Sequence, residues 1–355
     1  MTTTEHDTTV FGRLRADGAE QVLFSHDART GLRSVIVVHD TTLGPALGGV
    51  RMHAYEDESA ALDDALRLAR AMTLKASAAG LGLGGGWSVV IGDPARDKTQ
   101  DLLRAHGRFI ATLGGRFIPV NDIGTTQADI GVIGREASPV CDSGDPSPMT
   151  ALGVLEGIRA CLRADGTDGS LKGVRVCVQG VGNVGSALAG LLAAESAELL
   201  VADTDPARAT AVADRLGATV VAPEAAVHTA CDVLAPCAMG AVVNDATLPE
   251  LRCRIIAGGA NNVLATPGHA AALAARNILY APDFCVNAGG LVFLEEQILG
   301  HEREQAEQRV RQVGTRVAEV IAQARRTGTT TTEAAIDLAQ SRLRTARSRQ
   351  TPSPV

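Results

Sequence analysis

The sequence predicts an α/β protein with two domains, one of which is a doubly wound parallel sheet. The chain has 355 residues, a length typical of two domains. Apolar residues make up 45% of it and aromatic residues only 3%, so the core must consist mainly of Ala, Val, Leu and Ile. In the second half, short β-rich runs alternate with Ala-rich helical stretches. This alternation is typical of a parallel sheet with helices on both faces.

The first half is expected to form a smaller α/β unit. Residues 1–19 are polar and are expected to order late, if at all. Strands are expected at 21–27, 32–40, 88–94 and 116–120, and helices at 58–80 and 99–113. In the first helix, Leu62, Leu66 and Ala69 recur at spacings of three and four, and Asp57 is a candidate cap. The run "LGLGGG" (81–86) is expected to form a turn before the third strand.

The second half begins at a Pro/Ser/Asp/Gly cluster, 141–148, which is expected to be a hinge. Strands are expected at 174–180, 197–203, 231–237, 253–259 and 278–283. A long helix is expected from about 288 to 325, and the basic tail 342–355 is expected to be disordered. The first domain should therefore comprise residues 1–142 with about 331–355, and the second should comprise residues 143–330.

Composition argues against several classes of protein. The net charge of −7 disfavours nucleic acid or an anionic membrane as a partner. The N-terminus, "MTTTEHDTTV", lacks the apolar region of a signal peptide, and no apolar run is long enough to cross a bilayer. The seven cysteines form no C-x-x-C pair and read as reduced thiols, so no metal site is expected. A cytoplasmic protein is expected.

A glycine-rich motif predicts a dinucleotide site. In "VCVQGVGNVGSALAGLL", Gly180, Gly182 and Gly185 follow a Val-rich strand and open an Ala/Leu helix. The first glycine suits a tight turn, the second allows a pyrophosphate to approach the backbone, and the third allows close packing of helix on strand. Asp203 ends the next strand, where an acid can bind the ribose hydroxyls and repel a 2′-phosphate. The motif therefore predicts a Rossmann-type domain that binds NAD, although a purely structural glycine turn would give the same pattern.

The chain also resembles the Glu/Leu/Phe/Val dehydrogenase family, and it looks closest to the leucine and valine dehydrogenases. The resemblance covers about residues 20–340. It is carried by "GPALGGVRM" (44–52), "RAMTLKASAAGLGLGGGWSVVIGDP" (70–94), "PVNDIGTTQADIG" (119–131), "APCAMG" (235–240), "AGGANNVL" (257–264) and "YAPDFCVNAGG" (280–290). It implies an NAD-dependent homo-oligomer that deaminates an L-amino acid to a 2-oxo acid and ammonia in a cleft between two domains. The first domain would then bind substrate and mediate assembly.

The resemblance also implies roles for individual residues. Lys75 of "MTLK" matches the lysine that binds the substrate carboxylate, and Asp122 of "DIGTT" matches the aspartate that moves protons at the substrate nitrogen. Matching substrate-binding positions are Leu47, Gly48, Met72, Asn261, Asn287 and Leu294. Matching cofactor-binding positions are Thr150, Gly180, Gly182, Asn183, Val184, Gly185, Asp203, Cys237, Ala238 and Asn262.

One catalytic position departs from the family. The family has a second lysine after its glycine run, as "GGGK", which activates the water that hydrolyses the imine; here the residue is Trp87. An indole transfers no proton at neutral pH. Three hypotheses follow: an amino acid dehydrogenase with altered substrates, a biosynthetic reductase of a preformed imine or hydrazone, or an inactive NAD-binding subunit. Purely structural roles for these residues remain open: Trp87 could be core filling, Lys75 an exposed lysine and Asp122 a helix cap.

Overall fold

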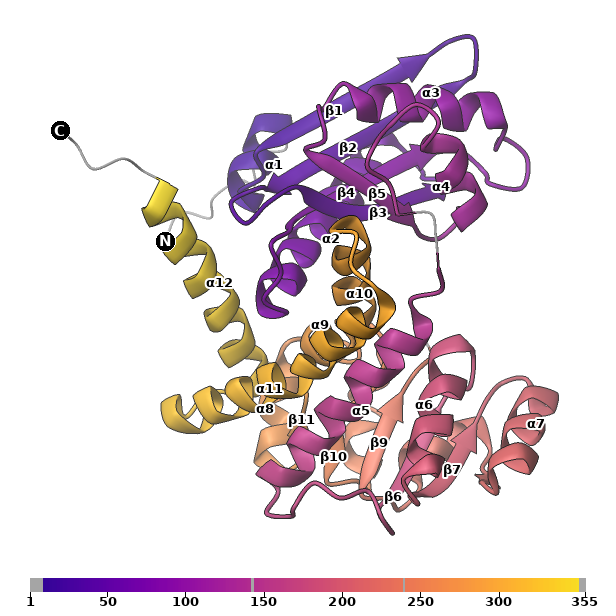
Figure 1. Cartoon of the computed structure of the whole chain (residues 1–355), viewed down its shortest axis with the longest axis vertical. Coiled ribbons are helices and arrows are strands. Elements are labelled where there is room, and N and C mark those ends of the chain that lie inside the picture. Colours follow the sequence, from indigo (N-terminus) through magenta and orange to yellow (C-terminus); the bar gives the residue numbers. More distant parts are fainter. Residues whose placement is uncertain (1–8, 142–143, 239, 351–355) are drawn as a thin grey trace. The chain divides into compact units, whose positions relative to one another are not determined.

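The computed structural model describes residues 9–141, 144–238 and 240–350, and the chain forms two compact units (Figure 1). The first unit comprises Met1–Gly144 and Gln340–Val355, and the second comprises Asp145–Ala339. The second unit is thus one continuous segment, whereas the first is made from both ends of the chain. Helix α12 (Thr331–Gln350) begins in the second unit and ends in the first.

A five-stranded mixed sheet forms the centre of the first unit. Its strands are β1 (Gln21–Asp27), β2 (Leu32–Asp40), β3 (Ala46–His53), β4 (Gly84–Ile91) and β5 (Phe117–Asn121). Their spatial order is β1-β2-β4-β3-β5. Strand β2 pairs antiparallel with β1 and β4, whereas β3 runs parallel to β4 and β5. The chain therefore places β4, the strand that carries Trp87, inside the sheet.

Two apolar cores cover the sheet. The helices of this unit are α1 (Val10–Asp17), α2 (Glu58–Ala78), α3 (Gln100–Ala111) and α4 (Gln127–Ile133). One cluster, which we call the α2-side cluster, joins α2 to the strands and includes Val35, Val37, Leu62, Leu66, Ala69, Trp87 and Val89. Helices α3 and α4 contribute Leu103 and Ile130 to a second cluster that contains Ile36 and Phe117. Consecutive strand residues thus point to opposite cores.

The second unit contains a six-stranded parallel sheet, which confirms the predicted fold class. Its strands are β6 (Arg175–Gln179), β7 (Glu198–Ala202), β8 (Thr219–Val220), β9 (Val233–Pro236), β10 (Ile255–Ile256) and β11 (Leu279–Tyr280). Their order is β11-β10-β9-β6-β7-β8 and all pairs are parallel. The order reverses between β6 and β9, which creates the switch point where such sheets bind ligands.

Helices alternate with these strands. They are α5 (Ser147–Ala164), α6 (Asn183–Ala194), α7 (Pro206–Leu216), α8 (Gly268–Ala275), α9 (Asp283–Val286), α10 (Gly289–Ile298) and α11 (Arg303–Thr327). Two short 3-10 turns, η1 (Pro223–His228) and η2 (Leu248–Glu250), complete the unit. In the part of the chain described here, no helix combines the length and the apolar character needed to cross a membrane.

The glycine run before Trp87 is not a turn, contrary to the expectation. Gly84, Gly85 and Gly86 belong to β4, and β3 is a strand that was not expected from the sequence. A Cβ on Gly84 would lie 2.0 Å from the carbonyl oxygen of Asp40, and one on Gly85 would lie 2.1 Å from the backbone nitrogen of Thr73. The glycines are therefore required because neighbouring backbone approaches the strand closely, not because the chain reverses.

Three other expectations about local structure were wrong. Residues 10–17, expected to order late, form α1, which Thr9 caps. The long helix expected over 288–325 is divided into α10 and α11, because Gly300 adopts a φ of +74° and Glu302 begins α11 with a capping box. Part of the tail expected to be disordered, up to residue 350, belongs to α12; residues 351–355 lie outside the described residues, as do 142 and 143 of the expected hinge.

We expect Gly85→Ala to destabilise the first unit by about 1–3 kcal/mol or more, because the new methyl group would overlap the backbone of α2. Urea unfolding of both variants measures this. Gly190→Ala is the matched control, since a Cβ there meets nothing within 4 Å and an alanine favours helix α6 by about 0.5–1 kcal/mol. Equal stability of the Gly85 variant and wild type would contradict the packing argument.

Candidate functional site

The glycine-rich turn of the second unit joins β6 to α6. Gly180 has a φ of +89°, and a Cβ there would lie 2.5 Å from Cβ of Ala238. A Cβ on Gly185 would lie 1.9 Å from the carbonyl oxygen of Gly180, whereas one on Gly182 would meet nothing within 4 Å. No side chain caps α6 at Gly182. The first N–H groups of this helix are thus available to an anion, and the backbone beside them is uncovered.

Asp203 follows β7 and holds this turn in place. Its Oδ2 accepts a hydrogen bond from the N–H of Val181 at 2.8 Å, and its Oδ1 accepts one from the N–H of Asp205 at 2.9 Å. The Nη1 of Arg208 lies 3.3 Å from Oδ1. Burial alone would raise the pKa of Asp203, but the two N–H donors and Arg208 outweigh it and lower the pKa. The carboxylate is therefore ionised at neutral pH.

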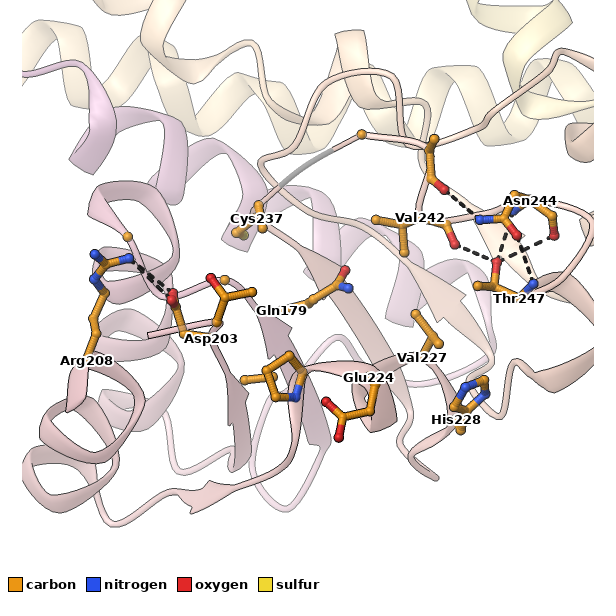
Figure 2. A pocket seen from close by; sticks show the side chains of 18 residues that line it. Gln179, Asp203, Arg208, Glu224, Val227, His228, Cys237, Val242, Asn244 and Thr247 are labelled. Carbon is orange, nitrogen blue, oxygen red and sulfur yellow. Dashed lines mark hydrogen bonds and ion pairs between the residues drawn. The ribbon is translucent and has the colours of Figure 1, made fainter. Parts of the chain in front are cut away.

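A cavity of about 600 Å³ opens beside the turn (Figure 2). Such a volume suits a small-molecule ligand. Of the predicted cofactor residues, those that line it are Gly180, Gly182, Asp203, Cys237 and Ala238. Predicted residues that do not line it are Thr150, Asn183, Val184, Gly185 and Asn262. Sequence reasoning missed the lining residues Arg208, Glu224, Val227, His228, Asn244 and Thr247.

The position of Arg208 in the sequence is a signal that could have identified it as a cavity residue. Figure 2 shows Asp203 and Arg208 together on one side of the cavity, with Asn244 and Thr247 across from them. Arg208 lies in the first turns of α7, directly after the strand that ends at the acid. The residues from η1 and from the segment 240–247 are brought in by tertiary folding, and no local pattern marks them.

In the first unit, Asp122 pairs with Arg51. The Nε of Arg51, on β3, donates to Oδ2 of Asp122 at 2.7 Å, and its Nη1 donates to Oδ2 of Asp64 on α2 at 2.9 Å. The side chain of Asp122 is 23% exposed. Helix α4 is capped by Thr126 instead, in a capping box with Asp129. The alternative in which Asp122 serves as the helix cap is thus excluded, and its carboxylate is oriented by an arginine.

Trp87 lies in β4 with its side chain on the same face as α2. It is only 8% exposed and belongs to the α2-side cluster, in agreement with the alternative in which Trp87 fills the core of this unit. One edge of the ring nevertheless reaches polar groups. A Cβ on Gly49 would lie 2.6 Å from Cζ2 of Trp87 and 2.9 Å from Cβ of Asp122. The guanidinium carbon of Arg51 is 5.7 Å from the ring centroid.

The indole N–H of Trp87 is buried and has no hydrogen-bond partner among the described residues. Burying such a donor without an acceptor costs about 1–3 kcal/mol. Trp87 therefore combines core packing with an unsatisfied donor, in a side chain that lies beside Gly49 and the Arg51–Asp122 pair.

The other predicted residues of the first unit lie on α2 and β3. Lys75 and Met72 both lie on α2 and are partly buried, and Met72 packs against the α2-side cluster. Leu47 is fully buried in β3. A Cβ on Gly48 would lie 1.8 Å from the carbonyl oxygen of Gly86, so this glycine is required by strand packing.

In the second unit, Asn261 and Asn287 are brought together. The Nδ2 of Asn287 donates to Oδ1 of Asn261 at 2.7 Å and to the carbonyl oxygen of Ala260 at 3.2 Å. Asn287 is 3% exposed, and its Oδ1 has no partner among the described residues. Leu294 is partly buried in α10. The asparagine pair thus has a structural role and also an acceptor that remains unsatisfied.

Two predicted cofactor residues outside the cavity have local backbone roles. Thr150 donates from Oγ1 to the carbonyl oxygen of Pro146 at 3.1 Å. Asn262 adopts a φ of +53°, a conformation that asparagine tolerates better than most residues. Within residues 9–141, 144–238 and 240–350, no group of three or more His, Cys, Asp or Glu side chains is arranged to hold a metal ion.

We expect Arg51→Ala to destabilise the protein by about 2 kcal/mol, because it leaves Asp64 and Asp122 without their shared, largely buried donor. Arg67→Ala is the matched control: Arg67 also binds Asp64, at 2.6 Å, but its side chain is 59% exposed, so its loss should cost under about 1 kcal/mol. Urea unfolding compares the two. Equal losses of stability in the two variants would show that the largely buried ion pairs of Arg51 contribute no more than the exposed pair of Arg67.

Comparisons with known proteins agree with this architecture. Residues 20–139 match the description "Glu/Leu/Phe/Val dehydrogenase, dimerisation domain", and residues 207–351 match "Glutamate/Leucine/Phenylalanine/Valine dehydrogenase". The chain is 44% identical to leucine dehydrogenase of Geobacillus stearothermophilus over 94% of its own length and 93% of that protein.

Solved structures show the same likeness. The crystal structure of L-tryptophan dehydrogenase from Nostoc punctiforme has a TM-score of 0.88 at 41% identity, covering 96% of this chain and all of that one (100%). Hetero-hexameric glutamate dehydrogenase from Thermus thermophilus has a TM-score of 0.74 at 25% identity, covering 95% of this chain and 91% of that one. The chain therefore belongs to the Glu/Leu/Phe/Val dehydrogenase family of amino acid dehydrogenases, which are oxidoreductases that act on CH–NH2 groups.

Proposed function

We propose that this protein is an NAD-dependent oxidoreductase that acts on the C–N bond of a small amino acid or a related imine. The observation that carries the cofactor assignment is the ionised carboxylate of Asp203 in a cavity beside an uncapped helix N-terminus. Family membership carries the C–N bond assignment.

The residues around the cavity fit a dinucleotide. The free N–H groups at the start of α6 would hold the pyrophosphate, and the absence of a side chain at Gly182 leaves it room. Asp203 would accept hydrogen bonds from the ribose hydroxyls. A bound nicotinamide would supply the acceptor or donor of the hydride that leaves or reaches the substrate carbon.

The first unit supplies proton and anion chemistry in this proposal. Asp122 exchanges a proton with the substrate nitrogen, and Arg51 fixes the direction in which its carboxylate points. Lys75 binds the substrate carboxylate, as its match to the family motif implies. Trp87 occupies the position where the family has its water-activating lysine, and it lies against the same glycine as Asp122.

A second candidate function follows from Trp87. Hydrolysis of an imine needs an activated water, but reduction of a C=N bond that already exists needs only a hydride and a proton. The indole offers no proton at neutral pH, and its N–H has no hydrogen-bond partner among the described residues. A reductase of a preformed imine or hydrazone, serving a biosynthetic pathway, is therefore the alternative that this geometry favours.

Assembly and location are parts of the same proposal. Strand β1 lies at the edge of its sheet and exposes 52% of Phe24. An apolar side chain on an edge strand favours contact with another copy of the chain. We infer a cytoplasmic homo-oligomer that uses a small-molecule substrate and binds neither nucleic acid nor a membrane.

Wild-type protein should bind NADH more tightly than NADPH, because the Asp203 carboxylate is ionised and faces the cavity. Asp203→Asn keeps an acceptor for the N–H of Val181 but removes the charge, so the ratio of the two dissociation constants should fall by about tenfold. Titration of each nucleotide by calorimetry measures the ratio. Equal affinities in the wild type would refute the assignment of Asp203 to NAD selectivity.

Wild-type protein should oxidise leucine or valine poorly, and Trp87→Lys should raise that rate by about tenfold or more by restoring an acid–base group. Trp87→Phe is the control, since it keeps an aromatic side chain in the α2-side cluster and supplies no ammonium group. Steady-state kinetics and thermal unfolding of all three proteins separate chemistry from stability. A wild-type kcat near the ~10 s⁻¹ typical of enzymes would show that another group activates water.

A further inference from the structure

The last turn of α2 is capped by a side chain from the far end of the chain. This turn contains Lys75, and the final carbonyl groups of a helix find no partners within it. The carbonyl oxygen of Ser77 accepts hydrogen bonds from the N–H of Gly80 at 3.1 Å and from Nη1 of Arg342 at 3.3 Å. Arg342 lies on α12, 265 residues later in the chain. A positive charge at this end of a helix also stabilises the last turn, because the helix dipole is negative there.

A second arginine fastens α12 to the first unit. The Nη2 of Arg347 pairs with Oδ2 of Asp40, and its Nε donates to Oγ1 of Thr42 at 3.2 Å. Asp40 ends β2, and its side chain is only 3% exposed. Leu343, one helical turn before Arg347, is buried as well. These contacts fix the position of the end of α12 on the first unit.

The two arginine contacts bear on the same stretch of α2. Arg342 binds the last turn of this helix directly. The contact of Arg347 acts through the sheet, because Asp40 lies opposite Gly85 in the ladder of β2 and β4. A Cβ on Gly85 would in turn lie 2.1 Å from the backbone nitrogen of Thr73, so β4 lies directly against α2 at this point. The end of α2 is thus held from two sides by one distant helix.

We propose that α12 positions the substrate-binding end of α2, with Arg342 and Arg347 as positioning residues that keep Lys75 directed at the substrate carboxylate. This inference rests on the proposed function, in which Lys75 binds that carboxylate. Neither arginine contacts substrate in this proposal, since one acts through a main-chain carbonyl and the other through Asp40. Loss of Arg342 unwinds the last turn of α2, makes Lys75 more reactive and weakens the binding of a carboxylate.

Acylation of lysine reports on Lys75 directly. The lysines of the chain are Lys75, Lys98 and Lys172, so mass spectrometry follows each one during reaction with acetic anhydride. Arg342→Ala should increase the acylation rate of Lys75 by about two- to fivefold, the range expected when a cation at a helix C-terminus is lost. The rates of Lys98, which pairs with Asp129, and of Lys172, which is exposed, should not change.

Carboxylate binding is the second measurement. The probe is isocaproate, a carboxylate without an amino group, and NADH is present throughout. Isocaproate should slow the acylation of Lys75 in the wild type, and the concentration that gives half of this protection should rise by about two- to fivefold in Arg342→Ala. Arg342→Lys keeps a donor and a positive charge, so it should restore most of the protection. Arg344→Ala is the matched control, since Arg344 is an exposed arginine of the same helix.

The contact of Arg347 needs a double variant. Arg347→Ala alone would leave the buried carboxylate of Asp40 without its cation and destabilise the first unit. Asp40→Asn combined with Arg347→Ala removes both charges, and circular dichroism verifies that the protein is folded. The acylation rate of Lys75 should rise by about twofold or more in this double variant, because α12 has lost one of its two polar contacts.

Unchanged acylation and unchanged protection of Lys75 in Arg342→Ala and in the double variant overturn the inference and leave the proposed function intact. Equal increases at Lys75 and Lys98 show a general loosening of the first unit, and they overturn the inference too. Wild-type protein in which isocaproate does not protect Lys75 refutes the role of this lysine in the proposed function, and the inference with it.

Discussion

The first unit depends on how closely the backbones of β3, β4 and α2 approach one another. Gly48 on β3 lies beside Gly86 on the neighbouring strand β4. Gly85 lies against the backbone of α2 and leaves no room for a methyl group. Because the strands carry no side chains there, the ring of the next residue can lie over Gly49 and reach the vicinity of Asp122. The same packing that stabilises the sheet thus determines where an acid, an arginine and an indole meet.

Arg51 links this packing to the electrostatics of the site. Its stem belongs to β3, and its guanidinium joins a carboxylate after β5 to one on α2. Burial alone would lower the pKa of Arg51, yet the hydrogen bond and charge of Asp122, with Asp64, outweigh it and raise the pKa. A buried charge of this kind is tolerated only when its partners stay in place, so the three segments must be ordered together.

The sequence predicted many of the regular elements and the strand–turn–helix arrangement of the glycine fingerprint, because both depend on local patterns. Strands β1 and β2 match their predicted limits, and Asp57 caps α2 as expected. The burial of Trp87 and the pairing of Arg51 with Asp122 could not be predicted, since each depends on strands distant in the chain. A glycine run likewise reads as a turn until the neighbouring backbone is known. Roles for Lys75 and Asp122 came from family resemblance, not from any pattern of charge or spacing.

Helix α12 has a consequence for how the protein is made. Asp40, whose side chain is 3% exposed, pairs with Arg347, which lies 307 residues later in the chain. During synthesis from the N-terminus, the second unit has all of its residues before this arginine emerges. The first unit, although it starts the chain, completes its contacts last and holds a buried carboxylate without its cation until then. Contacts between residues so distant in the chain slow folding. The second unit is therefore expected to complete its folding before the first, although synthesis begins with the first.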